Sequence, residues 1–217
     1  GREVILAVQD TTFIDYSTHL ATAGLGPLHA KGGYGMLCHG TLALTPERLP
    51  LGVLSLRLWA RDITKPKQRK THRSRAIENK ESHKWIDSVR AVAALKERLP
   101  DTHWVSVADR ESDIFEFLTE AQALDVDVLV RAAWNRNLTG PPAQLFTTLA
   151  AAPVVAHKLL VLPARGKRQA RTAKLEIRAC ALGLKSPRNG LAHGLAPPAL
   201  WGVWAYEPQP PADVEPL

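Results

Sequence analysis

Cysteines and long apolar runs are scarce in this chain of 217 residues, and each scarcity narrows the possible classes of protein. The only cysteines are Cys38 and Cys180, and neither belongs to a Cys-x-x-Cys pair. No disulfide framework or zinc site can be read from them, so two reduced, buried thiols are expected. No apolar run approaches the length that spans a bilayer, and no signal peptide opens the chain. We therefore expect a cytoplasmic protein with no membrane partner.

Acidic residues are also few relative to basic ones. The chain has 28 Lys and Arg against 21 Asp and Glu, which gives a formal net charge of +7. This excess of positive charge indicates a polyanion or an acidic surface as a partner. Hydrophobic residues make up 45% of the chain, which is enough for a substantial core in one large or two small domains.

The order of the predicted elements indicates an α/β fold. Strands are expected at residues 4–8, 34–45, 51–60, 103–108 and 125–131, and helices at about 80–98, 111–122 and 143–151. The second and third strands form a hairpin, and residues 13–33 are expected to be a loop. A right-handed crossover lets strand 103–108 lie parallel to the first strand. This order is typical of an RNase H-like mixed sheet flanked by helices.

Three segments follow from this interpretation. Residues 1–152 form the first part of the RNase H-like core. Residues 153–190 form a β insertion, in which two strands at 154–162 and 174–182 are joined by a long basic hairpin. Residues 191–217 supply the last core strand, expected at 201–206, and a truncated C-terminal end.

Two carboxylates are the strongest candidates for chemistry. Asp10 follows the apolar run at residues 4–8, and Asp109 follows the run at 104–108. Open α/β sheets place their chemistry at such strand ends, and hard divalent cations prefer carboxylate oxygens. The structural alternative for Asp109 is a helix N-cap. Glu111 and Asp113 are better explained by a favourable position at the start of a helix.

Basic segments and exposed aromatics are candidates for binding nucleic acid. Residues 61–75 and 165–171 are rich in Lys and Arg, which favours phosphate contacts, although a solvated surface loop is the ordinary alternative. Trp201 and Trp204 either pack in the core or stack on an unpaired base. His39 is more often a satisfied core histidine than a metal ligand.

Several motifs together carry a family resemblance. They include Val-Gln-Asp-Thr-Thr at 8–12, Gly-Tyr-Gly-Met-Leu-Cys-His at 33–39, Glu-Ser-His-Lys-Trp at 81–85 and Ala-Asp-Arg-Glu-Ser-Asp at 108–113. They continue with Val-Leu-Val-Arg-Ala at 128–132, Arg-Gly-Lys-Arg at 165–168, and Leu-Trp at 200–201 followed by Glu-Pro at 207–208. Over nearly the whole chain, this series resembles the DDE cut-and-paste transposases of the insertion-sequence-four family, Tn-five type.

The resemblance implies a set of functional residues and partners. Asp10 and Asp109 would be catalytic and would bind the family's pair of Mg²⁺ (or Mn²⁺) ions. The implied DNA contacts are Arg131 at the transposon end, Arg165, Lys167 and Arg168 in the β insertion, and Trp201 on a flipped base. The implied partner is double-stranded DNA, both transposon ends and target, bound by a homodimer of the intact enzyme. The implied location is the bacterial cytoplasm, in association with the nucleoid.

Parts of the family pattern are absent from the sequence. The third acid of the family is a Glu within Tyr-x2-Arg-x3-Glu-x6-Lys, and no such motif occurs here. The N-terminal DNA-recognition domain expected before Asp10 is absent as well. We therefore interpret the chain as a partial catalytic domain that binds DNA weakly and does not cut it alone. An RNase H-like nuclease or resolvase and a non-catalytic DNA-binding remnant are the alternatives.

Overall fold

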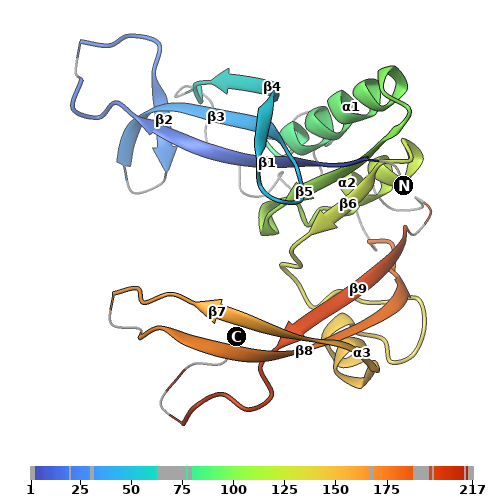
Figure 1. The fold of residues 1–217 in the computed structure, drawn as a ribbon. Coiled ribbons are helices and arrows are strands. Elements are labelled where there is room, and N and C mark those ends of the chain that lie inside the picture. The colour runs from blue at the N-terminus through green and yellow to red at the C-terminus, as the bar shows by residue number, and fades with distance from the viewer. Residues whose placement is uncertain are drawn as a thin grey trace. The chain divides into compact units, whose positions relative to one another are not determined.

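Two compact units make up the chain in the computed structural model (Figure 1). The first unit contains residues 1–133 and 186–196, and the second contains residues 134–185 and 197–217. The structure describes residues 3–19, 21–29, 32–62, 77, 80–166, 169–187, 196, 198–212 and 214. Among these residues, no helix is long and apolar enough to cross a bilayer.

A mixed sheet of six strands forms the first unit. Its strands are β1 (Glu3–Asp15), β2 (Gly26–His29), β3 (Gly32–Leu44), β4 (Pro50–Trp59), β5 (Thr102–Ala108) and β6 (Asp127–Val130). The strand order is β2-β3-β1-β5-β6, and β4 also pairs with β3. β3 runs antiparallel to β1, β2 and β4, whereas β5 is parallel to both β1 and β6. The predicted α/β class, the hairpin of the second and third expected strands, and the parallel pairing of β1 with β5 are confirmed.

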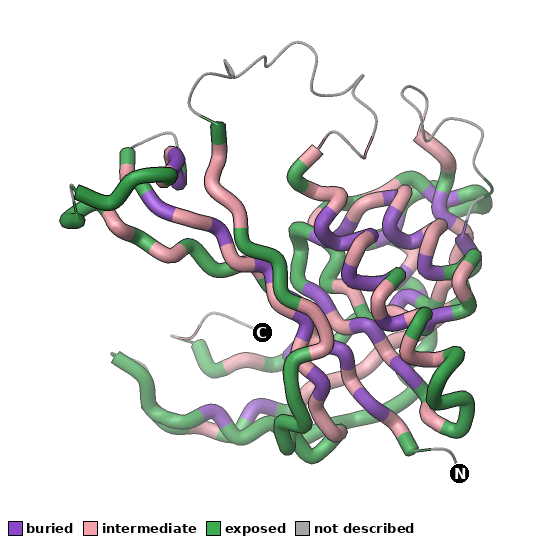
Figure 2. The backbone as a smooth tube through the Cα atoms, turned by 90° about the horizontal axis from the view of Figure 1, so that it is seen from above, coloured by how far each residue is buried: buried purple, intermediate pink, exposed green. Residues whose placement is uncertain are grey.

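The core of the first unit lies between this sheet and two helices, α1 (His83–Arg98) and α2 (Phe115–Ala123). The predicted helical stripe is buried, since Trp85 is 1% exposed and Val89 and Val92 are fully buried. Ile5 and Ala7 of β1 are buried as well. Figure 2 shows buried positions along the helices and the strands. Removing a side chain such as Ile5, Val89 or Val92 from water contributes roughly 1.5–3 kcal/mol to folding.

Two local predictions in the first unit differ from the structure. β1 continues to Asp15 and β2 follows, where residues 13–33 were expected to be a loop. The predicted helix at 111–122 is divided into a short 3-10 turn at Arg110–Ser112 and α2. The division arises because the Ile114 amide turns back to the Ser112 carbonyl at 2.6 Å, which ends the first turn.

The second unit is a three-stranded antiparallel sheet with one helix, α3 (Leu145–Ala151). Its strands are β7 (Val154–Leu162), β8 (Arg171–Gly183) and β9 (Ala199–Tyr206), in the order β7-β8-β9. A Cβ added at Gly202 would lie 2.7 Å from Leu182 Cδ2 and 2.9 Å from Leu149 Cδ2. The glycine therefore permits close packing of β9 on this side of the sheet.

Two boundaries of the expected segments differ from the structure. Residues 201–206 were expected to be the last core strand, but β9 pairs with β8, whose 13 residues offer it a long free edge. The division between the units falls after Ala133 rather than after residue 152. The reason is that the Thr139 amide donates to the Gly183 carbonyl at 3.0 Å, and the Lys185 amide donates to the Asn137 carbonyl at 2.9 Å.

Candidate active site where the pairing of β1 with β5 ends

The parallel pairing of β1 with β5 ends just before Asp10 and Asp109. Asp109 follows β5, whereas Asp10 lies within β1, which continues to Asp15 in pairing with β3. Gln9 lies opposite Ala108 in the register, and each aspartate is the next residue of its chain segment. Both aspartates are exposed. Two residues far apart in the sequence therefore follow the last paired positions of β1 and β5, at the carboxyl end of the parallel segment of the sheet.

Backbone amides orient one oxygen of each carboxylate. Asp10 Oδ1 accepts a hydrogen bond from the Thr11 amide at 2.7 Å, and Asp109 Oδ1 accepts one from the Glu111 amide at 2.9 Å. The chemistry of this donor set fits Mg²⁺ or Mn²⁺, which prefer carboxylate oxygens and retain several waters. No group of three or more His, Cys, Asp or Glu side chains is clustered for a metal ion within the described part of the chain.

The acidic residues around Asp109 have structural contacts. Asp109 also caps the 3-10 turn, which is the alternative weighed from the sequence. Asp113 is 8% exposed, and its Oδ2 accepts a hydrogen bond from the Ala133 amide at 2.8 Å. This bond ties the start of α2 to the segment that follows β6, so it holds the neighbourhood of Asp109 in place.

His39 is a neighbour of Asp10 that sequence reasoning treated only as a core residue. It is 2% exposed, and its Nδ1 lies 2.9 Å from the hydroxyl oxygen of Thr11. Its ring meets the Trp85 ring edge-on at 4.6 Å between centroids, and Nε2 has no hydrogen-bond partner among the described residues. Burial, assisted by the positive charge of Lys84, lowers the pKa of His39 to about 4.

Lys84 is the second neighbour that sequence reasoning missed. It is 6% exposed although it carries a charge, and its Nζ lies 3.4 Å from Glu111 Oε2. The ammonium also lies over the rings of Trp85 and Trp59, at 5.3 and 5.9 Å from their centroids. The only sequence signal was its place beside Trp85 in the buried stripe of a helix, where a lysine is unusual.

The candidate DNA contacts divide between the two units. Arg131 is exposed, and its amide donates to the Ala108 carbonyl at 3.3 Å, so its backbone adjoins the end of β5. Arg165 is exposed in the second unit, whereas Lys167 and Arg168 lie outside the described residues. The basic segment 61–75 also lies outside them from residue 63 onward. Its first member, Arg61, binds both carboxylate oxygens of Glu81 at 2.5 and 2.8 Å.

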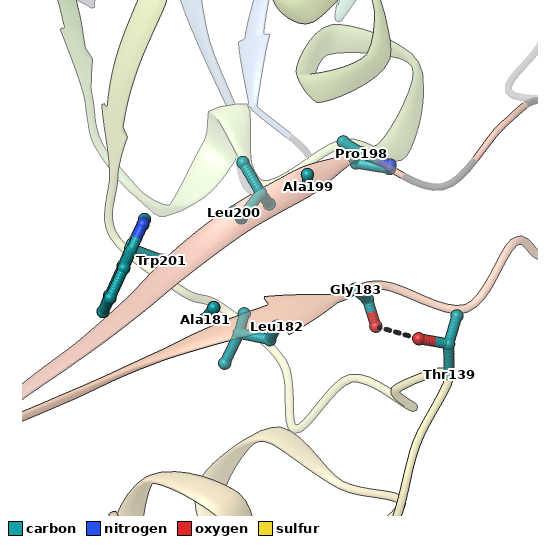
Figure 3. Close-up of a pocket in the computed structure, with 8 residues that line it drawn as sticks. All are labelled: Thr139, Ala181, Leu182, Gly183, Pro198, Ala199, Leu200 and Trp201. Atoms are coloured by element: carbon teal, nitrogen blue, oxygen red, sulfur yellow. Dashed lines mark hydrogen bonds between the residues drawn. The ribbon is translucent and has the colours of Figure 1, made fainter.

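Trp201 projects from β9 in the second unit and is 72% exposed. It borders a shallow apolar cavity of about 590 Å³, which also contacts Leu182, Leu200 and Pro198 (Figure 3). One wall is fixed where the Thr139 hydroxyl donates to the Gly183 carbonyl at 3.3 Å. An exposed indole beside an apolar hollow suits the stacking of a flat ring.

Chemically, the described residues of the first unit provide two exposed carboxylates, an exposed arginine whose backbone adjoins the end of β5, a buried lysine and a buried histidine. The second unit provides an exposed indole and Arg165. No protein-family model and no curated protein sequence matches the chain.

Proposed function

We propose that this chain is a partial catalytic domain of a DDE cut-and-paste transposase of the insertion-sequence-four family, Tn-five type. The observation that carries the proposal is the parallel pairing of β1 with β5, which puts Asp10 beside Asp109. The strand order supports an RNase H-like fold. The strands β1, β3 and β4 are antiparallel neighbours, with the short β2 between β1 and β3 in the chain. They are followed by β5, which is parallel to β1, and by β6, which is parallel to β5.

In this proposal the reaction is metal-dependent cleavage and transfer of DNA strands. A bound pair of Mg²⁺ or Mn²⁺ ions would supply an activated oxygen nucleophile and stabilise the leaving oxygen. Asp10 and Asp109 would hold these ions through the oxygens that the backbone does not engage. The rigid strands would keep the carboxylates in register, because displacement of either by about 1 Å is costly to such chemistry.

The remaining candidates would bind the substrate, double-stranded DNA of the transposon ends and the target. The net charge of +7 favours a polyanion. Arg131 would contact a phosphate next to the carboxylates, and Arg165 would contact one from the hairpin of the second unit. Trp201 would stack on an unpaired base. The intact enzyme would act as a DNA-bound homodimer, in the bacterial cytoplasm with the nucleoid.

A titration of Mn²⁺ tests the metal site. Wild type should bind Mn²⁺, and Asp10→Asn or Asp109→Asn should each weaken binding by at least tenfold. Asp101→Asn is the matched control, because Asp101 is an exposed aspartate in the turn before β5. Unchanged binding in both site variants would refute the proposal.

A second candidate function is a non-catalytic DNA-binding remnant. It is favoured by the lack of a third metal-binding side chain near the pair within the described residues. In that case Asp10→Asn and Asp109→Asn should leave the affinities for metal and for DNA unaltered. An RNase H-like nuclease or resolvase would instead cut DNA with this chain alone. We expect residues 1–217 to bind DNA weakly and to leave it uncut.

A further inference from the structure

Contacts of Thr11 and Glu111 connect the two carboxylates to the buried side chains of His39 and Lys84. On one side, the amide of Thr11 binds Asp10 and its hydroxyl binds His39. On the other side, the amide of Glu111 binds Asp109, and its carboxylate lies 3.4 Å from Lys84 Nζ. The two halves are coupled, because Lys84 and Asp10 both act electrostatically on His39. Lys84 therefore contacts Glu111 beside Asp109 and acts electrostatically on His39 beside Asp10.

The position of Lys84 is unfavourable unless anions compensate it. A buried ammonium loses hydration that is worth several kcal/mol. Lys84 also lies in the first turn of α1, which contains no acidic residue and where the helix dipole disfavours positive charge. The aromatic rings of Trp85 and Trp59 contribute cation–π attraction. Among the described residues, Glu111 is the carboxylate that forms an ion pair with Lys84, and 63% of its side chain is exposed, so water screens this pair.

We propose that Lys84 is the internal counterion of the Asp10–Asp109 pair and tunes its affinity for divalent cations. When no cation is bound, the Lys84 charge offsets the repulsion between the two carboxylates. When a cation binds, the same charge opposes it. This inference rests on the metal site of the proposed function and adds a residue that sets its strength without contacting the cation.

The direction in which cation affinity changes when Lys84 is replaced distinguishes a counterion from a side chain that only packs. A side chain that only packed would, when replaced, loosen the site and weaken cation binding. A counterion, when neutralised, should tighten binding, because a repulsive positive charge has been removed. One unit charge acting on a divalent cation across a partly hydrated gap changes the binding constant by about three- to tenfold at low ionic strength.

The test is a Mn²⁺ titration of the full chain, followed by electron paramagnetic resonance, with Lys84→Met as the main variant. Methionine keeps an unbranched apolar stem against Trp85 and Trp59 and removes the charge. We expect Mn²⁺ to bind about three- to tenfold more tightly, and the gain to shrink at high salt. Lys84→Arg should bind as wild type. Lys96→Met is the matched control on the same helix, where Lys96 pairs with Asp125 instead, and should also bind as wild type.

The thermal midpoint gives a second readout. Mn²⁺ should raise the midpoint of Lys84→Met more than that of wild type, because the variant binds the ion more tightly. If Lys84→Met does not fold, Lys84→Gln replaces it with the same expectation. Equal or weaker binding in a folded neutral variant would overturn the counterion role while leaving the metal site intact. Absence of Mn²⁺ binding in wild type would instead overturn the proposed function, and this inference with it.

Discussion

The β-sheets of the two units differ in how far their side chains are buried. In the first unit, α1 and α2 pack on the sheet, and side chains such as Ala7, Phe117 and Val89 are fully buried. In the second unit, eight of the nine residues of β7 are exposed, and Trp201 and Val203 of β9 are 72% and 61% exposed. Helix coverage explains the contrast, since the second sheet has a single helix of seven residues. A covered sheet can hold chemical groups in fixed positions, whereas an open one offers apolar surface for contacts.

The two units also differ in how their buried charged side chains are paired. The first unit buries Lys84 and His39 behind the exposed Asp10 and Asp109. In the second unit the buried ion pair is bidentate, with both Glu207 oxygens bound by Arg171. The two parallel bonds are charge-assisted and provide each oxygen of Glu207 with a donor. In the first unit, Asp10 and Asp109 are exposed and one oxygen of each accepts a backbone hydrogen bond, so their carboxylates are the groups that our proposal assigns to an added cation.

The largest expected effect is on the free energy of unfolding, when one tryptophan from each unit is replaced by alanine. Trp85→Ala should lower the free energy of unfolding by about 3–5 kcal/mol, because it empties a fully packed site between α1 and β3. Trp201→Ala should change it by about 0.5 kcal/mol or less, since the indole is mostly exposed. Chemical denaturation measures both. Equal losses in the two variants would contradict the contrast between the units.

The next largest expected effect is a pH dependence of the free energy of unfolding, caused by His39. Burial holds its pKa in the folded protein near 4, below the ordinary 6.5, so the unfolded chain takes up a proton that the folded chain refuses. The free energy of unfolding should therefore fall as pH drops from about 6.5 to about 4, by at most about 3 kcal/mol, and no further below that.

The control for this effect is His39→Gln, which keeps a polar partner for Thr11 but does not titrate. Denaturation of the metal-free protein at a series of pH values should show a shallower loss in the variant. The charges that face the imidazole are Asp10, Lys84 and Arg57. An identical slope in wild type and His39→Gln would show that other groups cause the acid sensitivity.

Most strands and helices of the first unit could be predicted from the sequence, because the patterns that specify them lie in short stretches of the chain. Continuous apolar runs identified β1 and β5, and the handedness of the crossover predicted that they are parallel. β2 was missed because it has four residues and contains Gly26 and Pro27, which are typical of turns. The sequence prediction placed residues 201–206 in the core sheet, whereas β9 pairs with β8. Strand-forming residues do not specify the strand edge with which they pair.

The candidate site was predictable only in part. Asp10 and Asp109 could be found because each follows an apolar run in the sequence. Asp109 does follow β5, but Asp10 marks only the end of the part of β1 that pairs with β5, since β1 continues to Asp15. The positions of Lys84 and His39 depend on contacts between α1, β3 and the turn after β5, which no local pattern encodes. The roles of Arg131, Arg165 and Trp201 in binding DNA stay predictions, and the exposure of all three is compatible with them.

Smaller effects are expected from these DNA contacts. Arg131→Ala and Arg165→Ala should each weaken DNA binding uniformly across sequences and reduce the slope of log affinity against log salt by about 1. Trp201→Ala should leave that slope unchanged and weaken binding to DNA with an unpaired base by about 1–3 kcal/mol. DNA affinities measured by fluorescence anisotropy over a series of salt concentrations distinguish the arginine variants from the tryptophan variant. A slope near zero in wild type would contradict phosphate contacts altogether.

The central claim is that Asp10 and Asp109 hold a divalent cation jointly, and a double-mutant cycle of Mn²⁺ affinity tests it most directly. Asp10→Asn, Asp109→Asn and the double variant are compared by electron paramagnetic resonance, with circular dichroism confirming that each is folded. Residues that share a ligand are strongly coupled, so the double variant should bind little more weakly than either single one. Losses that simply add, or binding that no variant changes, would contradict the claim.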